Sequence, residues 1–170
     1  GEIYAVTASG DLLKFDPDSK LLIISAFGTI PENGGFLSIA AGKEDTLLVV
    51  IAEQHQVKVF SQDREVYALK GDTAGEFIYP HNIAVFQDYV VVIAGDPFFT
   101  GDINNRVVMF DKSGRFLSEI VSGYSNTGFF GPRDAVFLNN RLYLLDLDMI
   151  SVFDKEGNFI TSFGGRGENP

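Results

Sequence analysis

The segment Ile150–Phe159, ISVFDKEGNF, contains the pattern on which the interpretation of the whole chain depends. A short β-rich run ends in Phe-Asp, and a turn containing Gly157 leads into a second β-rich run. The carboxylate of Asp154 can accept backbone N–H groups at the start of such a turn, and glycine readily adopts the positive φ that closes it. The segment therefore predicts a hairpin between two short antiparallel strands.

The Phe-containing strand of this pattern occurs four times along the chain. The four copies are Leu12–Asp16, Val57–Ser61, Val107–Asp111 and Ile150–Asp154. Their phenylalanines are spaced 45, 50 and 43 residues apart, at Phe15, Phe60, Phe110 and Phe153. Self-similarity at such a period indicates a repeat protein.

Each copy is preceded by another β-rich stretch, and copies two to four also carry a strand of small residues upstream. These small-residue strands begin near Ser38, Pro80 and Pro132. Small side chains suit a strand where several sheets converge on one axis, and no segment has the pattern of a helix of about ten residues or more. Four short antiparallel strands in each repeat of roughly 40–50 residues describe a β-propeller blade, so we predict an all-β chain of about four blades. A single sandwich with irregular strand spacing is the alternative, and it does not explain the recurring order.

The fourth copy resembles an NHL repeat. The resemblance rests on the segments Pro132–Val136, Arg141–Asp146, Ile150–Asp154, Gly157–Phe159 and Phe163–Gly164. The third copy, from Pro80 through Phe116, is similar with an enlarged loop, and the first two copies are weaker matches. The resemblance covers nearly the whole chain and implies a propeller, usually one of six blades.

The strand count departs from a complete six-bladed ring. The first copy lacks its inner strand, and the chain stops where a further inner strand would follow, so we expect 15 strands. The blades are expected to span approximately 1–33, 34–76, 77–128 and 129–170. Three arrangements remain open: a piece of a longer six-bladed chain, a compact four-bladed ring, or an incomplete arc that another copy completes.

Composition limits the classes of partner. The chain has 170 residues, with 13 Lys and Arg against 23 Asp and Glu, for a formal net charge of −10. Nucleic-acid binding and attraction to anionic membranes both rely on basic residues, so we expect no nucleic-acid partner. No apolar run reaches the length of a membrane helix, so we expect no membrane insertion. The absence of Cys removes disulfides and thiolate metal sites.

The chain begins at Gly1 without an initiator Met or a signal-peptide pattern, so we expect a processed or excised piece. Together with the habit of the NHL family, this start predicts a location outside the cell, in the periplasm or in the cell envelope.

The resemblance also implies where a ligand would bind. In such propellers the loops between second and third strands share one face with the connectors between blades, and that face is the usual binding surface. The long loop of the third copy supplies part of the predicted ligand-binding set: Asp96, Phe98, Phe99, Asp102, Asn104 and Arg106. The starts of the inner strands supply the rest: His81, Asn82, Arg133 and Asp134, with Ser38 at the corresponding place in copy two. The alternatives are that the phenylalanines plug the blade edge and that the polar groups satisfy one another.

The acidic residues and histidines of the chain form no clear metal or catalytic pattern. Asp146 and Asp148 lie two apart on one predicted strand face, but a pair of carboxylates is not a calcium site, so a solvated hairpin tip is the favoured interpretation. His55 and His81 without a third ligand make a poor catalytic zinc site. We therefore predict no catalytic and no metal-binding residue and no cofactor, with calcium as the alternative.

The resulting prediction is a non-catalytic propeller module that binds a protein, peptide or glycan. Two alternatives remain open. One is a structural subunit that self-associates through its open blade edges. The other is a metal-dependent hydrolase or lyase of the lactonase or amidating-lyase kind.

Overall fold

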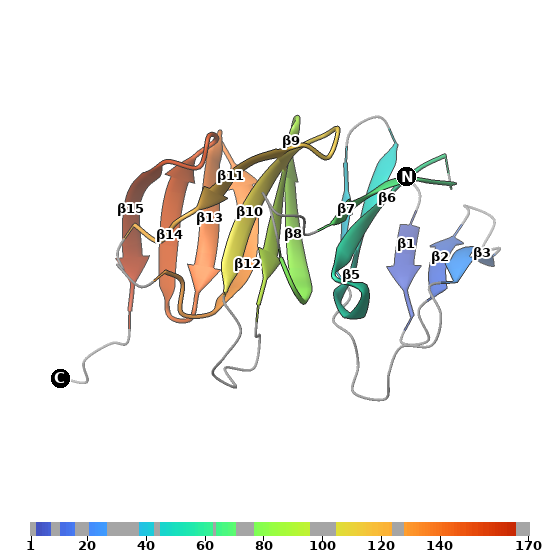
Figure 1. Ribbon diagram of the computed structural model, residues 1–170, viewed down its shortest axis with the longest axis horizontal. Helices are drawn as coiled ribbons and strands as arrows, with labels where there is room; N and C mark the ends of the chain where they lie inside the picture. The colour runs from blue at the N-terminus through green and yellow to red at the C-terminus, as the bar shows by residue number, and fades with distance from the viewer. Residues whose placement is uncertain are drawn as a thin grey trace.

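The computed structural model describes residues 3–7, 11–15, 21–26, 38–42, 45–62, 64–70, 77–95, 105–123 and 128–165. Within these ranges the chain is all-β and forms four antiparallel sheets (Figure 1). The strands are β1 (Ile3–Val6), β2 (Asp11–Phe15), β3 (Leu21–Ala26), β4 (Ile39–Ala41), β5 (Thr46–Ile51), β6 (Gln56–Ser61), β7 (Arg64–Lys70), β8 (Pro80–Phe86), β9 (Tyr89–Ala94), β10 (Arg106–Asp111), β11 (Phe116–Ile120), β12 (Pro132–Leu138), β13 (Arg141–Asp146), β14 (Met149–Asp154) and β15 (Phe159–Gly164). A short 3-10 turn, η1 (Ala52–Gln54), follows β5.

Each sheet is built from strands that are consecutive in the sequence. Sheet 1 contains β1 to β3, sheet 2 contains β4 to β7, sheet 3 contains β8 to β11 and sheet 4 contains β12 to β15. The described residues thus contain the 15 strands expected from the repeat, including a three-stranded first sheet. None of them belongs to a helix long and apolar enough to span a membrane.

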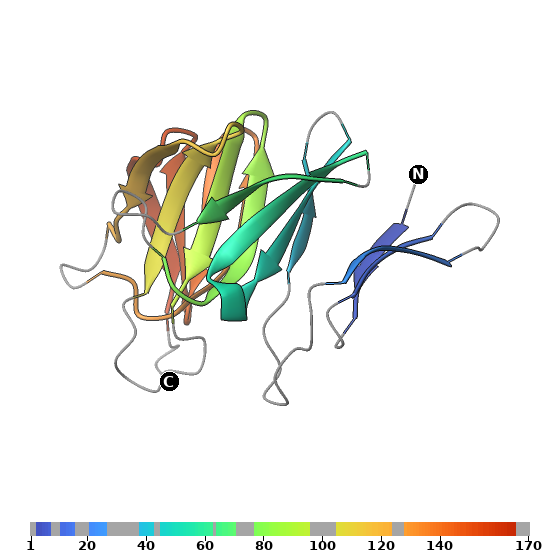
Figure 2. The same cartoon turned by 45° about the vertical axis from the view of Figure 1, so that its right-hand side comes forward.

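The sheets follow one another in chain order as an open arc (Figures 1 and 2). Strand β8 contacts both β4 and β12, so the first strands of sheets 2, 3 and 4 lie side by side on the inner edge of the arc. This is the arrangement of propeller blades around an axis, and it confirms the prediction that the small-residue strands are the inner ones.

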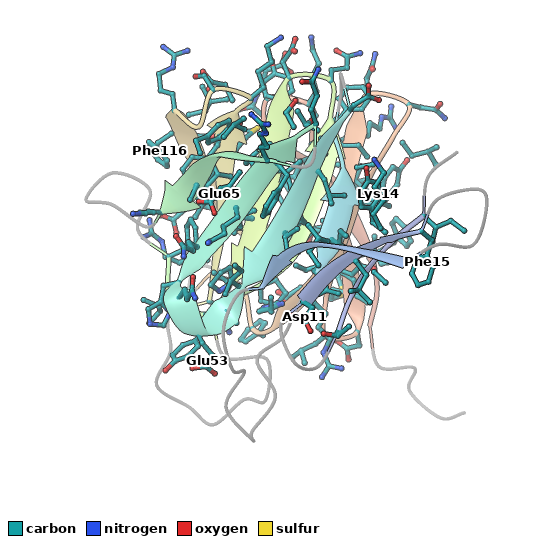
Figure 3. The ribbon with its side chains drawn as sticks, turned by 90° about the vertical axis from the view of Figure 1, so that its right-hand side faces the viewer. Asp11, Lys14, Phe15, Glu53, Glu65 and Phe116 are labelled. Carbon is teal, nitrogen blue, oxygen red and sulfur yellow. The ribbon has the colours of Figure 1, made fainter. Side chains whose placement is uncertain are left out.

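In the second, third and fourth repeats, the phenylalanine packs against the preceding sheet. Phe60 belongs to the cluster that includes Leu12 of sheet 1, and Phe110 belongs to the cluster between sheets 2 and 3. Phe153 lies in the cluster between sheets 3 and 4, where it is 0% exposed. Phe15 occupies the same repeat position in sheet 1, which no described sheet precedes, and it is 37% exposed (Figure 3). Burial of this position therefore depends on the neighbouring blade.

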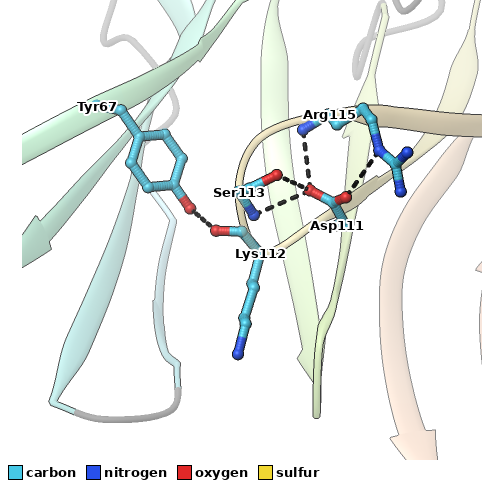
Figure 4. A network of polar contacts seen from close by, with 5 residues as sticks. All are labelled: Tyr67, Asp111, Lys112, Ser113 and Arg115. Carbon is cyan, nitrogen blue, oxygen red and sulfur yellow. Dashed lines mark hydrogen bonds and ion pairs between the residues drawn. The ribbon is translucent and has the colours of Figure 1, made fainter.

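The predicted Phe-Asp hairpin is present in both of its clearest copies. The Asp154 Oδ1 accepts the N–H groups of Glu156 and Asn158 at 3.0 and 2.8 Å, and Gly157 has a φ of 89°. In the third copy, Asp111 Oδ1 accepts the N–H groups of Ser113 and Arg115 at 2.9 and 3.0 Å (Figure 4). These bonds close the turn before the last strand of each sheet, as the sequence predicts.

Hydrogen bonds also lower the pKa of the Asp111 carboxyl in this turn. The bond from the Ser113 hydroxyl is the main cause that lowers the pKa of Asp111 to about 2, and it outweighs burial, which acts in the opposite direction. The turn packs against sheet 2, where the Tyr67 hydroxyl donates a hydrogen bond to the Lys112 carbonyl (Figure 4). The hairpin of one blade is thereby joined to the outer strand of the blade before it.

Sheet 4 has one covered face and one open face. Leu142, Leu144 and Phe153 pack on sheet 3. On the opposite face, Val136 is 58% exposed and Leu145 is 36% exposed. The positions equivalent to these two in sheet 3, Ala84 and Ile93, are buried because sheet 4 covers them. The open face of sheet 4 therefore has the apolar character of an internal blade surface.

Candidate functional site

The candidate site lies on the face of the arc where the inner strands begin. The ends of β5, β9 and β13 reach the same face, because each inner strand is antiparallel to the strand that follows it. Two backbone contacts illustrate this: the Gly95 N–H donates to the Tyr79 carbonyl, and the Leu147 N–H donates to the Gly131 carbonyl, both at 3.3 Å. The described ends of the connectors, at Tyr79 and Gly131, therefore lie on the same face as the ends of β9 and β13.

A continuous line of hydrogen bonds crosses three blades on this face. The Ser38 hydroxyl donates to Asn82 Oδ1 at 3.4 Å. The Asn82 amide Nδ2 donates to Asp134 Oδ1 at 2.9 Å and to the Arg133 carbonyl at 3.0 Å. Ser38, Asn82 and Asp134 hold equivalent positions in the repeat: Ser38 directly precedes β4, and the other two lie in β8 and β12. We call these three residues the polar line.

The polar line is also tied to the backbone of its own strands. Asn82 Oδ1 accepts the Ile83 N–H at 2.6 Å, and Asp134 Oδ1 accepts the Ala135 N–H at 2.8 Å. Asn82 thereby uses both its carbonyl oxygen and its amide nitrogen, which restricts its side chain to one orientation. Asp134 remains exposed to solvent, so its carboxylate is accessible to a ligand.

His81 and Arg133 lie at matching irregularities of the inner strands. The register of β8 against β9 shifts between Pro80 and Asn82, and the register of β12 against β13 shifts between Pro132 and Asp134. A bulge of this kind changes the direction of the extra residue's side chain and is common next to binding sites. The backbone carbonyl of Arg133 takes part in the polar line, and its side chain is exposed.

The His81 side chain is partly buried. Its Nε2 atom is buried and has no hydrogen-bond partner among the described residues. Burial lowers the pKa of His81 from 6.5 to about 4, because the charged imidazolium would lose its hydration. His81 is therefore neutral at pH 7 and adds no positive charge to this face.

His55 lies on the same face but forms a separate contact. It follows η1 in the left-handed region, with a φ of 53°. Its Nδ1 accepts the Tyr79 N–H at 3.1 Å, and the two rings meet edge to face with centroids 4.7 Å apart. His55 thus holds the connector that leads into β8. The sequence placed His55 in this loop but contains no signal for its pairing with Tyr79.

The interpretation of Asp146 as part of a solvated hairpin tip is wrong. Asp146 is 0% exposed. Its two carboxylate oxygens accept the N–H groups of Phe130 and Gly131 at 3.0 and 2.5 Å, so it anchors the connector between sheets 3 and 4. Strand alternation does not extend to Asp148, because β13 ends at Asp146 and Leu147, with a φ of 53°, begins the turn. The sequence also could not show that the connector folds over Asp146.

Of the six ligand-binding residues predicted in the long loop of the third copy, the structure describes Arg106. Asp96, Phe98, Phe99, Asp102 and Asn104 lie outside the described residues. Arg106 begins β10, and its guanidinium pairs with Glu119 of β11 through contacts of 3.0 and 2.5 Å. Its side chain therefore joins two strands of the same sheet. Of the predicted set, the structure brings together Asn82, Arg133 and Asp134, with His81 adjacent in β8.

Among the described residues, no group of three or more His, Cys, Asp or Glu side chains is placed to hold a metal ion. The polar groups that do converge are an amide, a hydroxyl and one carboxylate, with a neutral imidazole beside them. Such a set can donate and accept hydrogen bonds in fixed directions.

The comparisons with known proteins give a fold but no family. A scan against protein-family models finds no match, and a search of curated proteins finds no significant match. Among solved structures, the chain resembles a catalytically inactive virginiamycin B lyase from Staphylococcus aureus with quinupristin, with a TM-score of 0.69 and 15% identity over 99% of this chain. A selenomethionine form of the same lyase matches 96% of this chain with a TM-score of 0.51 and 10% identity.

Virginiamycin B lyase is a β-propeller, so the likeness shows that this chain has a β-propeller fold with an open arc of four sheets. The chain spans 54% and 66% of the lengths of the two matched structures. At this identity the likeness concerns architecture alone.

Proposed function

We propose that the chain is the NHL-like part of a non-catalytic β-propeller binding module, whose protein, peptide or glycan ligand contacts the polar line. The observation that supports this is the set of hydrogen bonds joining Ser38, Asn82 and Asp134 across three blades. One side chain at the start of the inner strand of sheets 2, 3 and 4 is held in place before any ligand arrives. Such preorganisation reduces the entropic cost of binding.

The chemistry of this face suits recognition of hydroxyl and amide groups. Asp134 offers an exposed carboxylate, and Arg133 is exposed beside it. Peptide backbones and sugar hydroxyls supply the complementary donors and acceptors. The buried Nε2 of His81 is poorly placed to act as a base on a bound substrate, which favours binding over catalysis.

The test is a screen of the 170-residue chain against peptide and glycan arrays, followed by titration of each hit. Asn82→Ala removes the centre of the polar line and is expected to weaken a genuine ligand at least about tenfold, the effect of losing one or two hydrogen bonds. Asp134→Asn tests the charge, and Glu156→Gln on the opposite face is its charge-matched control. Hits that bind both site variants as well as the wild type would contradict the proposal.

The titrations also test the assignment of His81 as neutral. Since the pKa of His81 is lowered to about 4, this residue gains little charge when the pH falls from 8 to about 5. Affinity for an uncharged hit is therefore expected to show no step near pH 6.5. A step at that pH that disappears in His81→Gln would contradict the burial of this side chain.

Self-association is the second candidate function, and the exposed apolar face of sheet 4 favours it. Val136 is 58% exposed on this face, and its equivalent Ala84 is buried by a neighbouring sheet. A second copy of the chain would then pack against the exposed face of sheet 4, in the way that sheet 4 packs against sheet 3. Light scattering on a size-exclusion column should then give a particle larger than 18.6 kDa.

Val136→Lys is expected to return that larger particle to monomers, because it places a charge in the contact. Val66→Lys is the matched control, since Val66 is 54% exposed on the outer strand β7 of sheet 2. A wild-type particle of 18.6 kDa would exclude this candidate.

A further inference from the structure

A cavity of about 270 Å³ opens between sheets 2 and 3, on the face opposite the polar line. Its walls belong to residues at the β4–β5, β8–β9 and β10–β11 turns and to strands β5 to β9. The lining residues are Gly42, Thr46, Leu48, Val59, Tyr67, Val85, Gln87, Asp88, Tyr89, Val90, Lys112 and Ser113. None of the residues predicted from the sequence to bind a ligand is among them.

The repeat shows why a cavity is present at this junction. Between sheets 3 and 4, the corresponding space holds Phe86 and Phe137, whose rings stack with centroids 5.1 Å apart and planes 19° apart. At the end of β8, Phe86 pairs with Tyr89. The equivalent position at the end of β4 is Gly42, which pairs with Thr46. Sheet 2 therefore has a glycine where sheet 3 has a phenylalanine. Val85 pairs with Val90 as Phe137 pairs with Leu142, so these two residues hold equivalent positions. Sheet 3 therefore has a valine where sheet 4 has the second phenylalanine of the stack.

The cavity has apolar walls and a polar rim. Leu48, Val59 and Val85 provide apolar walls. At the rim, the Lys112 ammonium lies 3.3 Å from the Asp88 carboxylate, so these two charges already neutralise one another. The other rim groups are uncharged hydroxyls and an amide. An apolar cavity of about 150 Å³ accepts one benzene, so the larger volume leaves room for a short substituent.

We propose that this cavity is a binding site for a small, neutral aromatic molecule, a single ring that carries a hydroxyl group. The ring of the ligand would occupy the space that Phe86 and Phe137 fill between sheets 3 and 4. Its hydroxyl would form hydrogen bonds with the uncharged groups of the rim. This site is independent of the polar line, since it opens on the opposite face. A charged aromatic acid is disfavoured by the net charge of −10.

The test uses benzyl alcohol as the probe and the methyl NMR signals of Leu48 and Val59 as the readout. Saturable shifts at millimolar concentration are expected in the wild type, and benzoate is expected to bind at least about tenfold more weakly. Val85→Phe places a phenylalanine in the cavity at the position equivalent to Phe137, and it should therefore abolish the shifts. A wild type without saturable shifts, equal binding of benzoate, or unchanged shifts in Val85→Phe would each overturn the proposal.

The converse variant keeps the test decisive if Val85→Phe fails to fold. Phe137→Val removes one ring of the stacked pair and should create a second cavity, between sheets 3 and 4. Benzyl alcohol should then produce additional saturable shifts at Leu142, which lies opposite residue 137. A folded Phe137→Val protein that shows no shift at Leu142 would overturn the inference that the missing ring makes the site.

Discussion

Replacing Phe153 with alanine is expected to lower the free energy of unfolding by about 3–5 kcal/mol, the usual loss for a buried phenylalanine. Phe153 is 0% exposed, and its ring meets those of Phe129 and Phe159 edge to face, with centroids 6.4 and 5.8 Å apart. Removing it leaves a cavity between sheets 3 and 4 that the rigid strands cannot close. Urea unfolding followed by circular dichroism measures the loss.

The matched control is Phe15→Ala, because Phe15 has the same place in the repeat. Phe15 is 37% exposed, so less apolar surface is lost and little cavity forms (Figure 3). We expect a decrease of less than about 1.5 kcal/mol. Equal losses for the two variants would contradict the conclusion that the preceding sheet provides the burial of this position.

Asp146→Ala is expected to lower the free energy of unfolding by about 2–4 kcal/mol, since it leaves two backbone donors without their acceptor. Asp146 is fully buried and accepts the Phe130 and Gly131 N–H groups at 3.0 and 2.5 Å. The variant should also loosen the connector before β12. Amide hydrogen exchange at Phe130 and Gly131 is expected to become faster, by more than the global loss of stability explains.

Ser151→Ala provides the control for burial without hydrogen bonding. Ser151 is also 0% exposed, and its Oγ has no hydrogen-bond partner among the described residues. Removing this hydroxyl should change stability by less than about 1 kcal/mol in either direction. A loss as large as that of Asp146→Ala would show that burial of a polar atom at this junction matters more than the bonds it makes.

The sequence predicted the blades because their signals are local. The Phe-Asp pattern around Phe110 and Phe153 needs only neighbouring residues: Asp111 and Asp154 accept N–H groups two and four residues ahead, and Gly157 supplies the positive φ. Strand identity depends on alternation and turn residues within a few positions. Such interactions are fully specified by the order of residues along the chain.

The candidate site was predictable only in part. The equivalent positions of Ser38, Asn82 and Asp134 are visible in the repeat, and the inner-strand starts were predicted to converge. The hydrogen bonds between them are not visible, because a shift of one residue at the bulges of β8 and β12 decides which side chains meet. Register irregularities of this size leave no pattern in the composition of a strand.

By itself, the sequence determined the repeat, the strands and the inner position of the small-residue strands, since these follow from interactions over short distances. The tertiary structure alone decided that Asp146 is buried beneath a connector, that Phe15 is exposed while Phe153 is not, and that a cavity opens beside Val85. Each of these depends on which sheet lies next to which. The burial of a side chain is a property of both packed surfaces, and the second surface comes from a distant part of the chain.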